Sequence, residues 1–284
     1  MSLRTIEALD ALHEDYDAFL CDVWGVLHNG VTAWPEAFGA LQRARSAGKT
    51  VVLITNAPRP HAQVRQQLGL LGVPEDAYDD VVTSGDVTRV LISEAPRRLF
   101  HIGTERDLAL FDGLDVELVE EPEASAVVVS GPYDDETETP DDYADMLRRL
   151  RARDLPMICA NPDIVVERGD RLVYCAGAIA RAYALLGGRT LIAGKPHGPI
   201  YAEAMRRIEA ARGAPVDRAR VLAIGDGLTT DVKGAMDNGF DLLFVSNGIH
   251  ARDYGEPGRP DPQRLDAYLR DFGADPVATM VRLT

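Results

Sequence analysis

Four apolar runs of this sequence end in polar residues of the types that catalytic sites use. The runs are FLCDVWG, LITNAPR, IAGKPHG and AIGDGLTTD, and the polar residues are Asp22, Thr55, Asn56, Lys195, Asp226 and Asp231. If the runs are strands of one parallel sheet, their carboxyl ends share the edge at which such sheets bind ligands. We therefore expect these side chains to converge on one site.

Carboxylates combined with a hydroxyl and an ammonium group favour phosphoryl transfer. A carboxylate can attack phosphorus, while the hydroxyl of Thr55 and the ammonium group of Lys195 hold phosphate oxygens. Mg²⁺ prefers a few oxygen ligands and keeps waters, which suits Asp22, Asp226 and a nearby backbone carbonyl. Asp231 has two interpretations. It is a functional residue that supports the metal site or pairs with Lys195, or it only stabilises the dipole at the start of a helix.

Lys195 stands out because only three of the 30 basic residues are lysines. A lysine at the end of a strand, in a chain that otherwise uses arginine, indicates that a compact and flexible ammonium group was needed there. We interpret Lys195 as a functional residue rather than a solvated one.

The two ends of the chain show the alternation of strands and helices that is typical of βαβ units on a parallel sheet. We expect helices over Pro35–Ala47, His61–Leu71, Ile200–Arg212, Thr230–Asn238 and Pro262–Phe272, with a surface loop over Gly255–Pro262. The runs TLIAGKP, RVLAIGD and DLLFVSNG add strands, and the two ends look like halves of one sheet.

The middle of the chain differs, because strands such as LFHIG, SAVVVSG and PMICANPD lie in an acidic, turn-rich stretch. We interpret it as an inserted domain. The prediction is an α/β protein with a Rossmann-like parallel-sheet core, residues 1–85 and 189–284, and an inserted α/β cap domain, residues 86–188.

Composition restricts the class of protein and its partners. The chain has 284 residues, a formal net charge of −15 and 46% hydrophobic residues, enough for two domains with buried cores. The negative charge argues against nucleic acid or an anionic membrane as a partner. Without a signal or membrane segment we expect a cytoplasmic protein that acts on a small molecule, with a homo-oligomer left open. Cys21, Cys159 and Cys175 are predicted to be reduced core residues.

The segments DVWGVLH, LITN, GKPH and GDGLTTD resemble the four ordered motifs of the haloacid dehalogenase superfamily. The insertion with ANPD at residues 160–163 resembles the cap of its class IIA phosphatases, the sugar-phosphatase and p-nitrophenyl phosphatase-like enzymes. The resemblance covers nearly the whole chain. It implies a Mg²⁺-dependent phosphatase of a small phosphorylated metabolite.

The resemblance also implies roles for individual residues. Asp22 attacks phosphorus to form an aspartyl-phosphate, and Thr55 and Lys195 bind the transferring group. Mg²⁺ is held by Asp22, Asp226 and the backbone carbonyl of Trp24, with Asp231 in support. Asn56 and Arg59 line the phosphate pocket, although a surface or capping role suits Arg59 equally. Asn161 and Asp163 belong to the cap or simply form an Asn-Pro-Asp turn.

Trp24 departs from the family pattern, because a second Asp usually stands two residues after the nucleophile. That Asp moves protons, a contribution worth about 10²–10⁴-fold in rate, and an indole cannot replace it. Three hypotheses follow: the substrate has a good leaving group, another group such as His28 takes over, or the chemistry differs from phosphate hydrolysis. A lone His is more simply structural. Asp226 and Asp231 argue for a metal, and so for phosphate.

Other catalytic motifs fail on their spacing. Arg189 and Pro196 break a Walker pattern, Thr230 stands where a dinucleotide fingerprint needs its third glycine, and no zinc spacing occurs. The alternatives that remain are a phosphate-metabolite binding or interaction protein with impaired catalysis, and a hydrolase of the dehalogenase or phosphonatase type.

Overall fold

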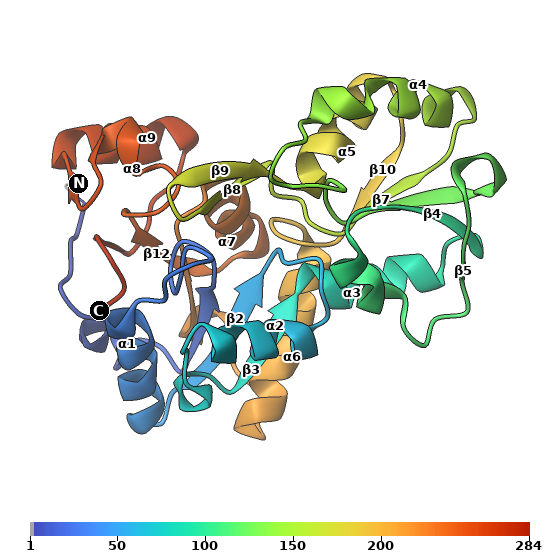
Figure 1. Ribbon diagram of the computed structural model, residues 1–284. Helices are drawn as coiled ribbons and strands as arrows, with labels where there is room; N and C mark the ends of the chain where they lie inside the picture. Colours follow the sequence, from blue (N-terminus) through green and yellow to red (C-terminus); the bar gives the residue numbers. More distant parts are fainter. Residues whose placement is uncertain (1–2) are drawn as a thin grey trace. The chain divides into compact units, whose positions relative to one another are not determined.

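The structure is a computed structural model that describes residues 3–284 (Figure 1). The chain forms two compact units. The first comprises the residues up to Thr55, Arg65–Val82 and Tyr201–Thr284, and the second comprises Asn56–Val64 and Thr83–Ile200. Each unit contains a parallel sheet, so the predicted α/β class with a parallel-sheet core is confirmed. The domain boundaries given above stay a prediction.

The sheet of the first unit has six strands in the order β15-β12-β11-β1-β2-β3. The strands are β1 (Ala18–Asp22), β2 (Thr50–Thr55), β3 (Asp80–Thr83), β11 (Val221–Gly225), β12 (Asp241–Val245) and β15 (Ala278–Met280). Every residue of β1, β2 and β11 is buried, as expected for strands covered on both faces. The chain leaves β1 toward β2 and returns beside it as β11, which makes this the switch point where such sheets bind ligands.

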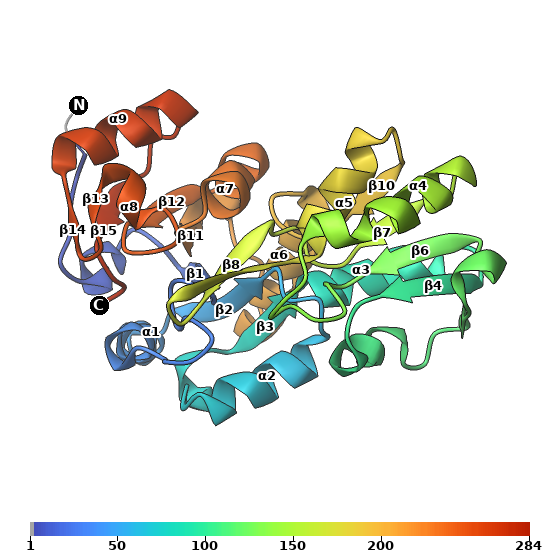
Figure 2. The ribbon, with the colours of Figure 1, turned by 45° about the horizontal axis from the view of Figure 1, so that its top comes forward.

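Helices cover both faces of this sheet. The α-helices are α1 (Pro35–Ser46), α2 (His61–Leu70), α6 (Gly198–Arg212), α7 (Lys233–Asn238), α8 (Ala251–Tyr254) and α9 (Pro262–Phe272). Figure 2 shows α1 and α2 on one face and α7 on the other, where the ring of Tyr201 from α6 packs on Phe240. The helices predicted from the sequence are confirmed within two residues except that of Thr230–Asn238, where a π-helical turn, Leu228–Val232, precedes α7.

The second unit has a five-stranded sheet in the order β10-β7-β6-β4-β5. The strands are β4 (Arg98–Ile102), β5 (Glu117–Leu118), β6 (Ala126–Val129), β7 (Met157–Cys159) and β10 (Thr190–Ile192), and the helices are α3 (Ser84–Ser93), α4 (Ala144–Ala152) and α5 (Ala176–Leu185). Alternate residues of β6 enter two cores, one with residues of α4 and α5 and the other with a residue of α3.

Two smaller ladders complete the units. The hairpin of β8 (Val165–Arg168) and β9 (Arg171–Tyr174) belongs to the second unit, and β13 (Gly255–Glu256) and β14 (Arg259–Pro260) form a short hairpin in the first. The predicted loop over Gly255–Pro262 is therefore wrong in part. Short 3₁₀ helices cover Leu9–Leu12, Glu75–Ala77, Glu105–Phe111, Glu121–Glu123, Pro140–Tyr143 and Arg218–Arg220.

One strand lies in a different sheet from the one expected. The run TLIAGKP was predicted to join the sheet of the chain ends, but β10 pairs in parallel with β7 in the five-stranded sheet. A short apolar strand carries no signal of which sheet it joins, so its position in the sequence misled the prediction. None of the helices within residues 3–284 is long and apolar enough to cross a membrane. The three cysteines are buried free thiols, as predicted.

Candidate active site

Three buried carboxylates gather at the carboxyl edge of the first unit's sheet. Asp22 ends β1, Asp226 directly follows β11 and Asp231 lies in the π-helical turn. Each offers an oxygen atom, and these three oxygens lie within 4.8 Å of one another. Their side chains are almost fully covered, with 4–5% of each residue exposed. The three carboxylates that we expected to converge therefore lie together.

The backbone on either side holds the carboxylate of Asp226. The amide of Ile249 donates a hydrogen bond of 2.9 Å to its Oδ2. A Cβ atom on Gly248 would lie 1.8 Å from the same oxygen, and one on Gly25 would lie 2.4 Å from it. Gly25 also has a φ of +88°, which favours glycine. The glycines of two turns thus let the backbone pack directly against the carboxylate of Asp226.

Asp231 is held in a similar way by its own turn. The amide of Gly227 donates a hydrogen bond of 3.1 Å to Oδ2 of Asp231. A Cβ atom on Gly225 would lie 2.3 Å from the Asp231 side chain, so β11 ends in a residue that leaves room for it. The π-helical geometry of this turn is a local departure of the kind that often occurs at functional sites.

The donor set fits a hard divalent cation. Three carboxylate groups this close and this buried repel one another unless a positive charge compensates them. Carboxylate oxygens are the ligands that Mg²⁺ and Ca²⁺ prefer. Among the described residues, Asp22, Asp226 and Asp231 form a group with the geometry for a metal ion.

Thr55 ends the strand next to Asp22. In the ladder between β1 and β2, Asp22 pairs with Ile54, so Thr55 lies one residue further toward the carboxyl edge. Its side chain is buried, with 5% of the residue exposed. The hydroxyl is therefore on the strand adjacent to the predicted nucleophile.

Trp24 and His28 belong to the loop that follows β1. Their rings meet edge to face at 5.0 Å between centroids, and a Cβ atom on Gly30 would lie 2.5 Å from the indole. Burial lowers the pKa of His28 to about 4, and its Nδ1 accepts a hydrogen bond from the amide of Gly30. His28 is thus neutral near pH 7 and shapes the loop, which supports the structural interpretation of this residue.

Asn56 and Lys195, also predicted to belong to the site, come together in the second unit. The side-chain oxygen of Asn56 accepts a hydrogen bond of 2.8 Å from the Lys195 amide, and its Nδ2 donates one of 2.8 Å to Oδ1 of Asp163. Lys195 is 3% exposed. The Asn-Pro-Asp turn is also formed, because Asn161 accepts a hydrogen bond from the Asp163 amide.

Sequence reasoning missed some of the residues that position the site. Gly248 and Ile249 hold Asp226, and Asp163 is bonded to Asn56 rather than only forming a turn. A glycine three residues after a strand, in FVSNGIH, was the available signal. Lys195 was placed with the carboxylates by an argument that required β10 in their sheet, and that argument fails.

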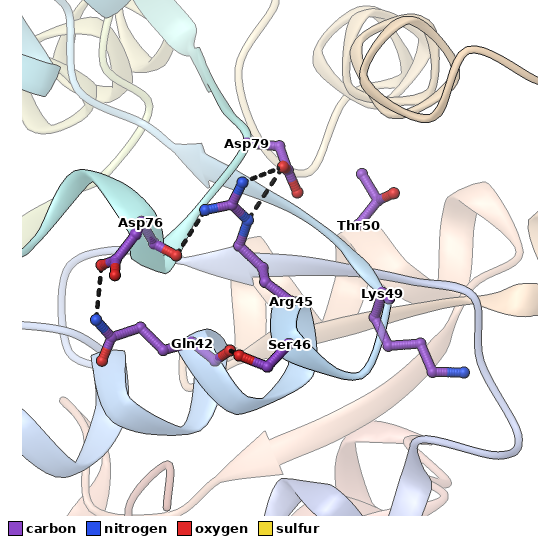
Figure 3. Close-up of a pocket in the computed structure, with 8 residues that line it drawn as sticks. Gln42, Arg45, Ser46, Lys49, Thr50, Asp76 and Asp79 are labelled. Atoms are coloured by element: carbon purple, nitrogen blue, oxygen red, sulfur yellow. Dashed lines mark hydrogen bonds and ion pairs between the residues drawn. The ribbon is translucent and has the colours of Figure 1, made fainter.

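A pocket of about 390 Å³ lies elsewhere in the first unit (Figure 3). It is lined by polar residues around Thr50, the first residue of β2, including Arg45, which is ion-paired with Asp79. Thr50 and Thr55 are at opposite ends of the same strand, about 17 Å apart at 3.3 Å per residue. The pocket is therefore separate from the carboxylate cluster.

Two family profiles match the chain. One, described as haloacid dehalogenase-like hydrolase, matches residues 19–117, and a second profile of haloacid dehalogenase-like hydrolases matches residues 192–273. The matched segments contain Asp22, Thr55, Lys195, Asp226 and Asp231.

Proteins of this kind are similar to the chain over most of its length. A haloacid dehalogenase-like hydrolase from Brucella suis is 60% identical, with a TM-score of 0.90 and coverage of 98% of this chain and 100% of that one. The D-glycerol 3-phosphate phosphatase of Mycobacterium tuberculosis is 28% identical over 94% of this chain and 74% of its own length. A 4-nitrophenylphosphatase from Thermotoga maritima is 25% identical, with a TM-score of 0.68 and coverage of 95% and 96%.

Proposed function

Because the chain belongs to the haloacid dehalogenase-like hydrolase family, we propose that it is a Mg²⁺-dependent phosphatase of a small phosphorylated metabolite. The observation that carries this proposal is the buried cluster of Asp22, Asp226 and Asp231 at the switch point of the sheet. The phosphatases among its relatives support the reaction class.

In this proposal Asp22 is the nucleophile. One of its carboxylate oxygens attacks phosphorus, the bond from phosphorus to the leaving oxygen breaks, and the leaving group departs with that electron pair. Water then attacks phosphorus, the bond to Asp22 breaks, and inorganic phosphate leaves with Asp22 restored. The loop between β1 and α1 and the turn after β12 keep the Asp226 carboxylate in place.

Further residues bind and hold the substrate. Thr55 donates its hydroxyl to a phosphate oxygen, and the ammonium group of Lys195 balances the charge of the transferring group. Asn56 and Arg59 line the phosphate pocket. Asp22, Asp226 and the carbonyl of Trp24 would hold Mg²⁺, with Asp231 in support. The ion supplies positive charge against the phosphate oxygens when bound.

Proton transfer to the leaving group limits the range of substrates. Trp24 has no acidic proton, and His28 accepts a hydrogen bond from Gly30 and lacks the acidic imidazolium proton near pH 7. The leaving oxygen must therefore depart without an acid from this loop. We infer a substrate with a good leaving group, such as an acyl, aryl or pyrophosphoryl oxygen.

Hydrolysis of p-nitrophenyl phosphate by the full chain tests the proposal. We expect turnover with Mg²⁺ that a chelator abolishes and that falls on the order of 10⁴-fold in Asp22→Asn. Asp271→Asn, an exposed carboxylate of α9, is the matched control and should keep full activity.

Two outcomes would contradict the proposal. In the first, the protein is folded and loaded with Mg²⁺ but inert on a broad panel of phosphate esters and anhydrides. If some of these compounds still stabilise it against heat, it is a binding protein. Metal-independent release of halide from haloacids would indicate the dehalogenase type of reaction.

A further inference from the structure

The side-chain amide of Asn56 bonds to the main chain of Lys195 at two points, both in the second unit. Its oxygen accepts a hydrogen bond of 2.8 Å from the Lys195 amide, and its nitrogen donates one of 3.4 Å to the Lys195 carbonyl. Asn56 is 2% exposed and Lys195 is 3% exposed, and shielding from water strengthens such bonds. A primary amide carries both a donor and an acceptor, so one side chain can bond to both atoms of the Lys195 backbone.

Gly194 allows the Asn56 amide to approach the backbone this closely. A Cβ atom on Gly194 would lie 2.8 Å from the side-chain oxygen of Asn56. It would also lie 2.5 Å from the hydroxyl oxygen of Ser84, the first residue of α3. Any side chain at position 194 would therefore push against the amide that holds Lys195.

Asp163 fixes the orientation of the Asn56 amide. Its Oδ1 accepts a hydrogen bond of 2.8 Å from Nδ2 of Asn56. An ionised carboxylate can only accept, so the nitrogen of the amide must face Asp163, which leaves the oxygen for the Lys195 amide. A hydrogen bond to a charged group is also stronger than one between neutral groups, so this orientation is strongly preferred.

The starts of two helices support the segments that carry these side chains. In α3, a Cβ atom on Gly85 would lie 2.4 Å from the carbonyl oxygen of Pro58. In α5, a Cβ atom on Gly177 would lie 2.2 Å from the carbonyl oxygen of Pro162. Both segments thus pack directly against the backbone of a helix, as expected for groups that must be placed accurately.

We propose that Asn56 is a positioning residue for Lys195 and that Asp163 orients it. The two bonds to the main chain fix the point from which the Lys195 side chain extends, and so restrict the positions that its ammonium group can reach. The inference rests on the proposed phosphatase function, in which that ammonium group balances the charge of the transferring group. It specifies the role of the Asn56 side chain: a change at Asn56 alters phosphate binding only through Lys195.

A double-mutant cycle for phosphate binding tests this role on the full chain. Isothermal titration with inorganic phosphate, in the presence of Mg²⁺, compares the wild type with Asn56→Ala, Lys195→Ala and the double variant. Asn56→Ala should weaken phosphate binding about tenfold, the effect of losing roughly one or two hydrogen bonds. In the Lys195→Ala background it should have no further effect. Mg²⁺ affinity should stay unchanged, because the carboxylates that hold the ion belong to the first unit.

Two results of this cycle would overturn the inference. One is the same loss in both backgrounds, because Asn56 would then contact phosphate itself. The other is an unchanged phosphate affinity in Asn56→Ala. Asn238→Ala is the matched control, since it also removes a bond from a side-chain amide to a main-chain carbonyl, and it should bind phosphate like the wild type. Circular dichroism confirms folding, and Asn56→Ser serves if Asn56→Ala does not fold.

Exchanging the two side chains tests the role of Asp163. Asn56→Asp should weaken phosphate binding because two carboxylates then face each other, and Asp163→Asn should weaken it less because a neutral bond replaces a charged one. The variant with both changes again has one donor facing one acceptor, so it should recover most of the affinity. An unchanged affinity in Asp163→Asn, or no recovery in the exchanged variant, would overturn the role of Asp163.

Acylation of lysine measures the position of Lys195 without any ligand. The other two lysines of the chain, Lys49 and Lys233, are internal controls. The protein is exposed to the N-hydroxysuccinimide ester of acetic acid, and peptide mass spectrometry follows each lysine with time. In Asn56→Ala the rate at Lys195 should rise about tenfold, while the rates at the two controls stay the same. An unchanged rate at Lys195 would overturn the inference.

Failure of the proposed function looks different. In that case the wild type hydrolyses no phosphate ester and binds no phosphate with Mg²⁺, while the acylation of Lys195 still rises in Asn56→Ala.

Discussion

The two parallel sheets of this protein differ in the charged groups near their carboxyl edges. At the carboxyl edge of the first unit's sheet the functional groups are buried carboxylates, Asp22, Asp226 and Asp231. Near the same edge of the second unit's sheet lie Arg59, which pairs with Asp107, and Arg106 and Arg168, which pair with Asp135. The first edge is thus suited to a cation, whereas the charges of the second edge are paired with one another.

The difference lies in how each charge is held. Backbone amides and glycines hold Asp226 and Asp231, so the first edge depends on close backbone approach. Side chains hold the arginines of the second edge, through Asp135, Asp107 and the hydroxyl of Ser130. Small changes of volume should therefore damage the first edge, and changes of charge should damage the second.

An added carboxylate at the first edge should have the largest effect. Trp24→Asp supplies the missing proton donor, so hydrolysis of alkyl phosphates should rise about 10²–10⁴-fold, with a far smaller effect on p-nitrophenyl phosphate. Rates for a series of leaving groups measure this. In the wild type the rate should fall steeply as the leaving-group pKa rises, and the variant should flatten that slope.

Trp24→Asn is the control, because it removes the indole without adding a proton donor. A slope that is already shallow in the wild type would show that another group protonates the leaving oxygen.

Adding one methyl group beside Asp226 should weaken metal binding. Gly248→Ala places a Cβ atom 1.8 Å from Oδ2 in the present geometry, so the carboxylate must move. We expect a loss of about 10–100-fold in Mg²⁺ affinity, typical of changes beside a metal ligand. Titration calorimetry with Mg²⁺ measures it. Gly69→Ala in α2 has open space around its Cβ and should bind Mg²⁺ like the wild type.

Two histidines, one in each unit, should have a smaller effect, on the pH dependence of the free energy of unfolding. Burial lowers the pKa of His28 in the first unit and of His101 in the second to about 4. The unfolded chain binds these protons near pH 6.5, so it holds more protons than the folded protein between about pH 6.5 and 4. The free energy of unfolding should fall as the pH is lowered through this range and level off below it.

Urea unfolding at about pH 7 and pH 5 measures this dependence, because pH 7 lies above the histidine range and pH 5 lies within it. His28→Gln and His101→Gln should each make it shallower, and the double variant shallower still. Variants that keep the full wild-type dependence would show that neither histidine contributes.

Much of the fold and part of the site follow from the sequence. The carboxylates were predictable because Asp22 ends one buried strand, and Asp226 and Asp231 come after a neighbouring one. Such strands read as continuous apolar runs. The helix Pro262–Phe272 was predictable from Asp261, which caps it, and from Gly273, which ends it.

Other features depend on contacts between distant segments. The sheet that β10 joins is decided by its pairing with β7, more than 30 residues earlier in the chain. The ion pairs of Arg59 with Asp107 and of Arg106 and Arg168 with Asp135 join segments that share no local pattern. The support of Asp226 by Gly248 and Ile249 requires knowing which loops meet after folding.

Trapping the covalent intermediate tests the central claim most directly. The full chain is mixed with Mg²⁺ and an excess of p-nitrophenyl phosphate, quenched during turnover, and reduced with borohydride, which converts an aspartyl-phosphate to homoserine. Peptide mass spectrometry should find homoserine at position 22 and leave Asp226 and Asp231 unmodified. Turnover with an intact Asp22, or with reduction at another aspartate, would contradict the assignment of the nucleophile.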